Sequence, residues 1–271
     1  MNETLPNNPN DPDDSNDPDG SAGDVDYGTI GAGYSSYRRP DPRIARVVHQ
    51  ALGDGVETVV NVGAGAGAYE PGRLRVTAVE PSRAMREQRG PGLVRAVDAV
   101  AEQLPFGDGA FDAAMTTFSV HQWSDPAAGL REMRRVARGR VAVLTCDPAL
   151  VREFWLYEYA PLVLDTEARR YPSVEGIAGA LGGNVTVTPV PIPSDCTDGF
   201  NEAYFGRPES FLDPGAVQAC SAWSFVAEET RERYVGSIKA ALEDGSWDSR
   251  YGALRDADVY EGSLVLIRAT P

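Results

Sequence analysis

The stretch VVNVGAGAGAYEP, residues 59–71, decides the fold of this sequence. Three valines and one Asn are followed by glycine at every second position, as Gly63, Gly65 and Gly67. An apolar run of this length predicts a buried strand. The glycines predict a tight turn after it, because glycine permits backbone angles that side chains forbid and lets a ligand approach the main chain closely. We therefore expect a ligand-binding turn at the end of a strand.

Strands and helices alternate around this turn. Short apolar runs predict strands, and apolar residues at helical spacing predict helices. The expected strands are 57–62, 75–80, 92–97 (the weakest), 111–118, 140–145, 185–192 and 263–269, and the expected helices are 82–89, 125–137 and one that begins at Pro42. This alternation implies a mostly parallel sheet with helices on both faces. The expected fold class is α/β, with a Rossmann-like, doubly wound sheet of seven strands.

The composition excludes several classes of protein. No run of eighteen apolar residues is present, and the N-terminus lacks the basic start and apolar stretch of a secretory signal. The three cysteines lie far apart and there are only two histidines, which argues against a disulfide scaffold and a metal site. A net charge of −15 is unfavourable for nucleic acid. We therefore expect a cytoplasmic protein without a metal, a nucleic-acid partner or a membrane anchor; its oligomeric state stays open.

Changes in composition also divide the chain into segments. The N-terminus is rich in Asn, Asp and Pro and cannot bury enough apolar surface to order itself. Two long insertions look helical and are rich in aromatic residues, and we expect them to cap the strand ends where open α/β sheets bind ligands. The expected segments are a disordered acidic tail, a Rossmann-like core, a first cap insertion, a late core strand, a second cap insertion and a final core strand: 1–26, 27–147, 148–182, 183–195, 196–258 and 259–271.

The glycine turn alone does not identify its ligand. Read as Gly63-x-Gly65-x-x-Ala68, it also fits the dinucleotide fingerprint. Glu80, at the end of the second expected strand, can accept two ribose hydroxyls from a dinucleotide or from another nucleoside. A strand-to-helix connection without any ligand fits the turn as well.

Five motifs in a fixed order distinguish these alternatives. They are VVNVGAGAG, VTAVEPS, AEQLPF, FDAAMTTFSVHQW and LREMRRVARGRVAVLT. In this order they resemble the class I S-adenosylmethionine (SAM)-dependent methyltransferases, in particular the small-molecule branch related to ubiquinone/menaquinone biosynthesis and trans-aconitate methylation. The resemblance covers residues 37–146. It implies that SAM is the cofactor and that a small molecule receives its methyl group.

The resemblance also implies a SAM site spread over these motifs. By residue, it assigns the amino-acid end of SAM to Gly63, Ala64 and Gly65, the ribose to Glu80, the adenine to Pro81, Ser82 and Ala101, the sulfonium to Thr117, and the SAM carboxylate to Arg38 or Arg39. Two positions depart from the family's pattern. Asn61 stands where the family often has an acid, and we expect it to organise the turn by hydrogen bonds. Val100 takes the usual place of an adenine-binding Asp, so Asp98 is the candidate for that contact.

Methyl transfer needs a base only if the acceptor is protonated when it attacks. His121 is the best candidate, because it follows the fourth expected strand on the cofactor side. Asp198 and Tyr204 would join it if the polar stretch 193–209 covers the sheet. Three functions stay open: methyl transfer to a small molecule, non-methylating SAM chemistry such as cyclisation to aminocyclopropane carboxylate, and SAM binding without catalysis. A tight pocket with no room for an acceptor would favour the second.

Overall fold

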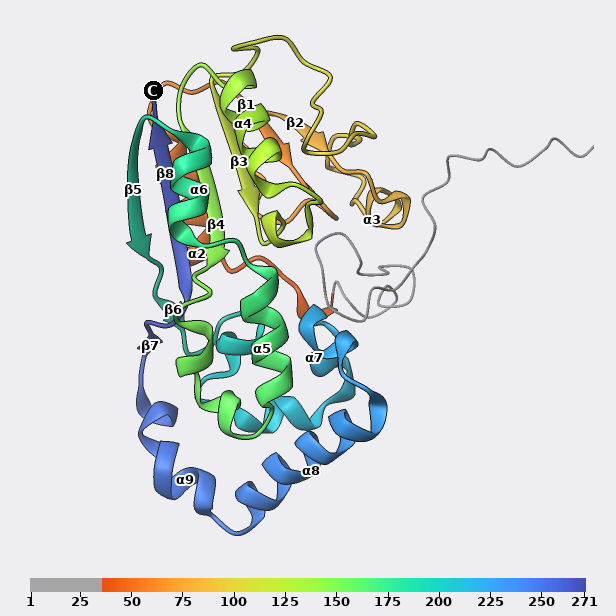
Figure 1. Cartoon of the computed structure of the whole chain (residues 1–271), viewed down its shortest axis with the longest axis vertical. Coiled ribbons are helices and arrows are strands. Elements are labelled where there is room, and N and C mark those ends of the chain that lie inside the picture. Colours follow the sequence, from red (N-terminus) through yellow and green to blue (C-terminus); the bar gives the residue numbers. More distant parts are fainter. Residues whose placement is uncertain (1–35) are drawn as a thin grey trace, which may run out of the picture.

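The computed structural model describes residues 36–271. The predicted acidic tail, 1–26, lies outside the described residues, as does the start of the predicted core. In the described part, a twisted sheet with helices on both faces stands above a helical cap (Figure 1). The mixed α/β class predicted from the sequence is confirmed.

The sheet contains six strands in the order β2-β1-β3-β4-β8-β5. Their bounds are β1 Thr58–Val62, β2 Arg75–Val79, β3 Ala113–Thr117, β4 Val141–Cys146, β5 Asn184–Pro189 and β8 Leu264–Thr270. Strands β2, β1, β3 and β4 are parallel, whereas β8 runs antiparallel to both β4 and β5. The carboxyl ends of the four parallel strands therefore meet at one edge, which faces the cap (Figure 1).

The prediction of seven strands is wrong by one for the described residues. Of the expected strand 92–97, Val97 alone pairs with the sheet, as an isolated bridge to Val79. Leu93 and Val94 are 36% and 46% exposed, so the apolar residues that suggested a strand bury little surface. An apolar run forms a strand only where a neighbouring layer covers it, and here that layer is missing among residues 36–271.

Helices cover the two faces of the sheet unequally. Helix α2 (Pro42–Leu52) packs on one face through Ile44, Val48 and Leu52, and its N-terminus is capped by Asp41. Helices α4 (Pro126–Val136) and α6 (Val174–Leu181) pack together on the other face. Because α6 lies against the sheet, that part of the predicted first cap insertion belongs to the core layers instead.

The cap consists mainly of short helices. Its helices are η2 Val151–Glu153, η3 Trp155–Glu158, α5 Pro161–Arg170, η4 Asn201–Tyr204, η5 Pro208–Leu212, α7 Pro214–Gln218, η6 Ser221–Phe225, α8 Glu228–Glu243, α9 Ser246–Tyr251 and η7 Gly252–Asp256. The strands β6 Ile192–Pro193 and β7 Val259–Tyr260 form a separate two-stranded sheet, and the short helices α3 Arg83–Glu87 and η1 Val120–Gln122 belong to the core. Aromatic side chains form the cap's own core; those less than 2% exposed are Phe154, Phe205, Phe211, Trp223 and Trp247. Most cap aromatics therefore hold these helices together.

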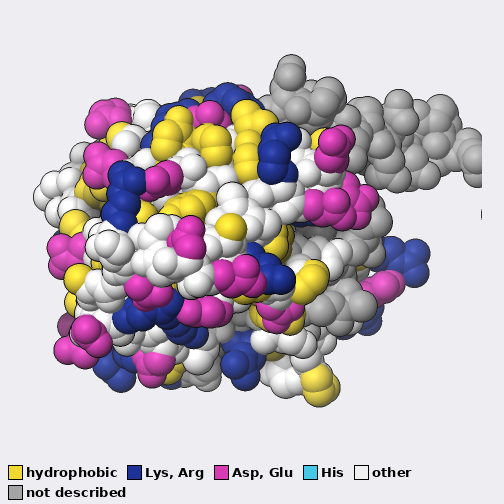
Figure 2. Space-filling view, turned by 90° about the horizontal axis from the view of Figure 1, so that it is seen from below, with side chains coloured by type: hydrophobic (Ala, Val, Ile, Leu, Met, Phe, Trp, Pro, Cys, Tyr) yellow, Lys and Arg dark blue, Asp and Glu magenta, His cyan; other side chains and the backbone are white. Residues whose placement is uncertain are grey.

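The outer surface of the cap mixes both signs of charge. Figure 2 looks at the molecule from the cap side and shows basic and acidic side chains interspersed over the coloured surface. A polyanion binds to a continuous basic tract, and the coloured part of this face does not present one. No helix within residues 36–271 is both long and apolar enough to cross a bilayer.

Candidate functional site

A cavity of about 640 Å³, which we call the outer cavity, lies at the carboxyl ends of β1, β2 and β3. It is bounded by the glycine turn, by the ends of β2 and β3 and by the segment that precedes α2. The predicted cofactor residues that line it are Arg38, Arg39, Gly63, Ala64, Gly65, Glu80, Pro81, Ser82, Ala101 and Thr117. Asn61 and Asp98 are absent from its lining. The structure thus brings most of the predicted set together.

The glycine turn adopts a backbone that requires glycine. Gly63 and Gly65 have φ angles of 66° and 50°, in the left-handed region. A Cβ atom added at Gly63 would lie 1.8 Å from Oγ of Ser119, so the turn approaches the loop after β3 too closely for any side chain. The turn therefore presents bare main chain to the outer cavity.

A buried ion pair supports the turn from behind. Arg89 donates to both carboxylate oxygens of Glu70 at 2.9 Å, and each side chain is only 4% exposed. Arg89 also donates to the carbonyl of Gly65, and Asn61 donates to Glu70. The prediction that Asn61 organises the turn by hydrogen bonds therefore matches its contacts, although it acts from outside the cavity.

Glu80, at the end of β2, is anchored to the turn. Its two carboxylate oxygens accept hydrogen bonds from the backbone N–H groups of Gly65, at 2.8 Å, and Ser82, at 2.9 Å. The residue is 7% exposed, and burial raises the pKa of its carboxyl while the two N–H groups act against that rise. Each oxygen keeps lone-pair capacity for a further donor. A diol could therefore bind here without disturbing the turn.

Asp98 does not reach the outer cavity. Its carboxylate pairs with Arg86 at 2.7 Å and its side chain is 68% exposed. The proposed compensation for Val100 required a continuous strand through 92–97, and that strand is missing. Val100 itself lines the outer cavity, so an apolar contact replaces the predicted carboxylate.

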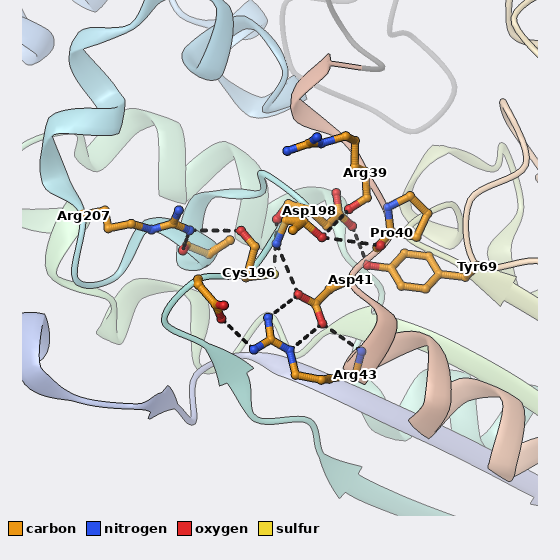
Figure 3. Close-up of polar contacts among 11 residues, drawn as sticks. Arg39, Pro40, Asp41, Arg43, Tyr69, Cys196, Asp198 and Arg207 are labelled. Atoms are coloured by element: carbon orange, nitrogen blue, oxygen red, sulfur yellow. Dashed lines mark hydrogen bonds and ion pairs between the residues drawn. The ribbon is translucent and has the colours of Figure 1, made fainter.

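Asp198 joins three segments of the chain at the rim of the outer cavity. It is 2% exposed, and its oxygens accept hydrogen bonds from Arg38 at 2.5 Å and from the hydroxyl of Tyr69 at 2.7 Å. Burial, and then the charge of Asp198, raise the pKa of Tyr69. Figure 3 shows Asp198 and Tyr69 pointing toward one another. Asp198 thus positions two residues that line the cavity.

A second group of contacts ties the same segments together (Figure 3). Asp41, which is fully buried, accepts hydrogen bonds from Arg43 and from the backbone N–H of Thr197. Arg43 also pairs with Asp195 at 2.6 Å. Burial opposes ionisation, but the hydrogen bonds outweigh it and lower the pKa of Asp41 to about 2. The start of α2 is therefore fastened to the cap by charged side chains.

The comparison with known families concerns the same stretch of chain. Residues 60–144 match the family described as "Methyltransferase domain". They contain the glycine turn, Glu80 and β3, which together form most of the outer cavity. The chain contains a class I SAM-dependent methyltransferase domain. SAM is the cofactor of this domain.

Two curated relatives each match about a third of the chain. "Uncharacterized protein YafE" of Escherichia coli is 39% identical over 91 residues, which are 32% of this chain and 44% of that protein. "Demethylmenaquinone methyltransferase" of Mycolicibacterium vanbaalenii is 34% identical over 102 residues, 38% of this chain and 41% of that protein. The chain thus spans less than half the length of these curated relatives.

One solved structure resembles nearly the whole described chain. It is a "Putative methyltransferase from antibiotic biosynthesis pathway" of Anabaena variabilis, with a TM-score of 0.81 and 27% identity. The match covers 88% of this chain and all of that one. The likeness therefore includes the cap as well as the methyltransferase domain.

The outer cavity fits SAM by its chemistry. Its volume of about 640 Å³ is within the range of sites for drug-sized ligands, about 300–1,000 Å³. The Gly63–Gly65 turn offers bare main chain, and Glu80 offers a carboxylate where a ribose needs acceptors. Arg39 is exposed and lines the cavity, whereas Arg38 is engaged by Asp198.

A smaller cavity, of about 30 Å³, lies beside the outer one, and we call it the inner cavity. Arg38, Phe118 and Gln122 line both cavities and so form the wall between them. The other walls come from the cap: Glu167, Tyr171, Phe200, Asn201 and 219–222, together with His121 from the core. The inner cavity is therefore where the methyltransferase domain meets the cap.

Phe118 in this wall has a strained backbone. Its φ of 50° lies in the left-handed region, which costs a non-glycine residue about 1–3 kcal/mol. Its ring packs against Phe200, with centroids 5.2 Å apart, and the guanidinium of Arg38 lies 5.3 Å from its centroid. Contacts from both cavities hold this conformation.

The predicted base, His121, lines the inner cavity. It is 5% exposed, and its ring lies against Tyr171 with centroids 4.6 Å apart. Burial, followed by the charges of Arg170 and Arg38, lowers its pKa well below the ordinary value, so the imidazole is neutral. The structure therefore separates His121 from the outer cavity by one layer of side chains.

Of the other two predicted catalytic residues, Asp198 lines the outer cavity, whereas Tyr204 lines neither cavity. It is 7% exposed, its ring stands edge-on to Phe211, and burial raises the pKa of its hydroxyl. Sequence reasoning missed Tyr69 and Phe118, whose positive φ angles leave no mark in the sequence. It also missed Glu167 and Asn201, which come from cap segments without a motif.

Proposed function

We propose that this protein transfers the methyl group of SAM to a small-molecule acceptor. The observation that carries the proposal is the junction of β1 and β2, where the bare Gly63–Gly65 turn and the anchored carboxylate of Glu80 face one cavity. The name of the relative "Demethylmenaquinone methyltransferase" supports a quinone-like acceptor. The Anabaena likeness supports a role in secondary metabolism.

We assign the contacts of SAM as follows. Glu80 accepts the ribose hydroxyls, and the Gly63–Gly65 turn holds the amino-acid end. Arg39 binds the SAM carboxylate, because it lines the cavity and Arg38 is already paired with Asp198. The remaining assignments are those of the resemblance: Pro81, Ser82 and Ala101 for the adenine and Thr117 for the sulfonium.

The protein's part in methyl transfer is chiefly to hold two reactants in line. SAM supplies an activated methyl group, and the carbon–sulfur bond breaks as the bond to the acceptor forms. Alignment of this kind accounts for a large part of such a barrier, up to about 7–11 kcal/mol. His121 is our candidate for the group that takes a proton from the acceptor, since it is neutral and lines the inner cavity.

Calorimetry with SAM, S-adenosylhomocysteine and NAD tests the cofactor assignment. We expect the first two to bind and NAD not to bind. Binding of NAD without SAM would overturn the proposal, since the turn would then serve a dinucleotide.

The size of the inner cavity favours a second candidate function. Its volume of about 30 Å³ admits about two water-sized groups and excludes an aromatic ring. In this conformation the chemistry could be intramolecular: a base removes the Cα proton of SAM, Cα bonds to Cγ, and the Cγ–sulfur bond breaks. The products would be aminocyclopropane carboxylate and methylthioadenosine.

Incubation with SAM alone separates the candidates. Methyl transfer needs an added acceptor and gives S-adenosylhomocysteine, whereas cyclisation gives methylthioadenosine without one. The matched controls are a reaction without protein and one with Glu80→Ala, because SAM also decays by itself. Binding without a product under any acceptor would leave the third function, SAM binding without catalysis.

A further inference from the structure

The inner cavity contains a carboxylate whose orientation is fixed. Oε2 of Glu167 accepts a hydrogen bond from Nδ2 of Asn201 at 2.6 Å. The amide of Asn201 cannot turn over without loss, because its Oδ1 accepts from the indole N–H of Trp223 at 3.0 Å. Asn201 and Trp223 are 3% and 0% exposed. The cap therefore holds Glu167 against the cavity through a buried relay.

His121 brings an unsatisfied polar atom to the same cavity. Its Nδ1 is buried and has no hydrogen-bond partner within the part of the chain that the structure describes. An unsatisfied buried polar atom costs about 1–3 kcal/mol, and such atoms are rare in folded proteins. Its Nε2 lies 3.4 Å from Nε2 of Gln122. A ligand that binds Nδ1 would recover this cost.

The charges around the cavity limit the ligand to a neutral group. The side chains of Arg38 and Arg170 are buried or nearly so, and their charges act on His121. Their positive potential disfavours a cation beside the imidazole. Arg38 is paired with Asp198, and the charge of Arg170 acts on the carboxyl of Glu167, so the positive charges are already balanced by carboxyl groups and do not call for an anion. No room remains for a counterion in about 30 Å³.

We propose that the inner cavity is a subsite for a hydroxyl group of the small-molecule substrate, held between Glu167 and His121. The inference rests on the proposed function, because it takes the outer cavity as the SAM site. A hydroxyl can donate its one hydrogen to the carboxylate and accept a hydrogen bond from an imidazole that is protonated at Nδ1, the tautomer compatible with the amide N–H of Gln122 beside Nε2. A CH₂OH group is about the size of two water-sized groups and fits the volume. The substrate is therefore an alcohol that reaches past Phe118, and a ring must stay outside this wall.

Because the chain has two histidines, NMR of labelled histidine can follow His121 directly and use His49 as the reference. We would label histidine with ¹⁵N, saturate the protein with S-adenosylhomocysteine and titrate methanol, methylammonium chloride and sodium formate, three probes of similar size. Methanol should shift the His121 imidazole signals saturably, and at lower concentration than either ion does. His49 lines neither cavity, so its signals report any general solvent effect.

Two variants of helix α5 test whether Glu167 takes part in binding methanol. Glu167→Gln should raise the methanol midpoint at least threefold, whereas the matched control Asp165→Asn, which loses a carboxylate paired with Arg152, should leave it unchanged. A shift of His121 by methylammonium or formate at lower concentration, an equal midpoint in Glu167→Gln, or no response to methanol would each overturn the subsite. The comparison of the three probes needs no variant, so it stands even if Glu167→Gln does not fold.

Failure of the proposed function gives a different result. If calorimetry detects no binding of SAM or S-adenosylhomocysteine, the outer cavity has another ligand. The methanol titration of the free protein then still decides whether the inner cavity binds a hydroxyl.

Discussion

The outer and inner cavities share one wall but are built in different ways. The outer cavity is built around the main chain of the glycine turn at the ends of neighbouring parallel strands, and most of its residues come from consecutive motifs. The inner cavity consists of side chains from the loop after β3 and from separate segments of the cap. A site made of main chain keeps its form while side chains vary, whereas a site made of side chains can change with each substitution. The first suits a constant cofactor and the second a particular substrate.

Removing the buried ion pair between Arg89 and Glu70, behind the glycine turn, should have the largest effect on the outer cavity. Arg89→Met leaves Glu70 buried without its partner, and loss of one member of a buried pair costs about 3–5 kcal/mol. We expect that loss of unfolding free energy in denaturant titrations, together with weaker SAM binding. Arg83→Met, which removes an exposed pair with Glu87, is the control and should change stability little. Equal losses in both variants would mean that the turn does not depend on the buried pair.

Removing the carboxylate of Glu80 should weaken the binding of SAM. Two hydroxyl contacts and the anchoring of Gly65 are lost, on the order of 2–4 kcal/mol in total. Glu80→Ala should therefore raise the Kd for SAM more than ~30-fold by calorimetry, and leave the methanol response of the inner cavity in place. The control is Glu87→Ala, an exposed carboxylate on the nearby α3. Retained affinity in a folded Glu80→Ala protein would remove Glu80 from the site.

A pH titration tests a buried carboxyl group of the cap, that of Glu202. Burial raises the pKa of Glu202 from 4.5 to about 7. Between these values the unfolded chain has released the proton and the folded chain has kept it, so stability falls as the pH rises. The loss amounts to at most about 3 kcal/mol. Glu202→Gln should flatten this fall, measured by denaturant midpoints at pH 4.5 and 8; an unchanged slope would assign the fall to other groups.

The smallest change is expected at Tyr204. Because its hydroxyl lines neither cavity, Tyr204→Phe should alter unfolding free energy by about 1 kcal/mol or less and leave SAM affinity unchanged. Melting temperature and calorimetry measure both. A variant of normal stability that loses product formation would restore Tyr204 to the active site and extend that site into the cap.

Residues of the outer cavity were predictable because their function depends on local backbone. Gly63 and Gly65 follow a strand directly, and Glu80 ends the next one, so pattern and topology together put them at one edge. The prediction that Asp98 contacts the cofactor failed for the same reason, because it depended on a strand at 92–97 that has no covering layer. Where the local element is wrong, every side-chain direction derived from it is wrong as well.

The inner cavity could not be predicted, because tertiary packing alone assembles it. Glu167 and Asn201 lie in cap segments without a periodic motif, and their hydrogen bond joins two of those segments. The aromatic residues of the cap suggested a pocket, but most of them form the cap's own core. Composition indicates that a segment has a core, and it does not indicate which side chains are left over to line a cavity.

The position of β8 in the sheet has a consequence for synthesis. This strand fills the gap between β4 and β5, although it is made after both. Until residues 264–270 leave the ribosome, β4 offers one row of unpaired amides and carbonyls, on a strand whose side chains are all meant to be buried. Such an edge is a template for pairing with other chains. The nascent protein is therefore most prone to aggregate in the interval between the synthesis of β4 and that of β8, and a chaperone that shields β4 during this interval should increase the yield of folded protein.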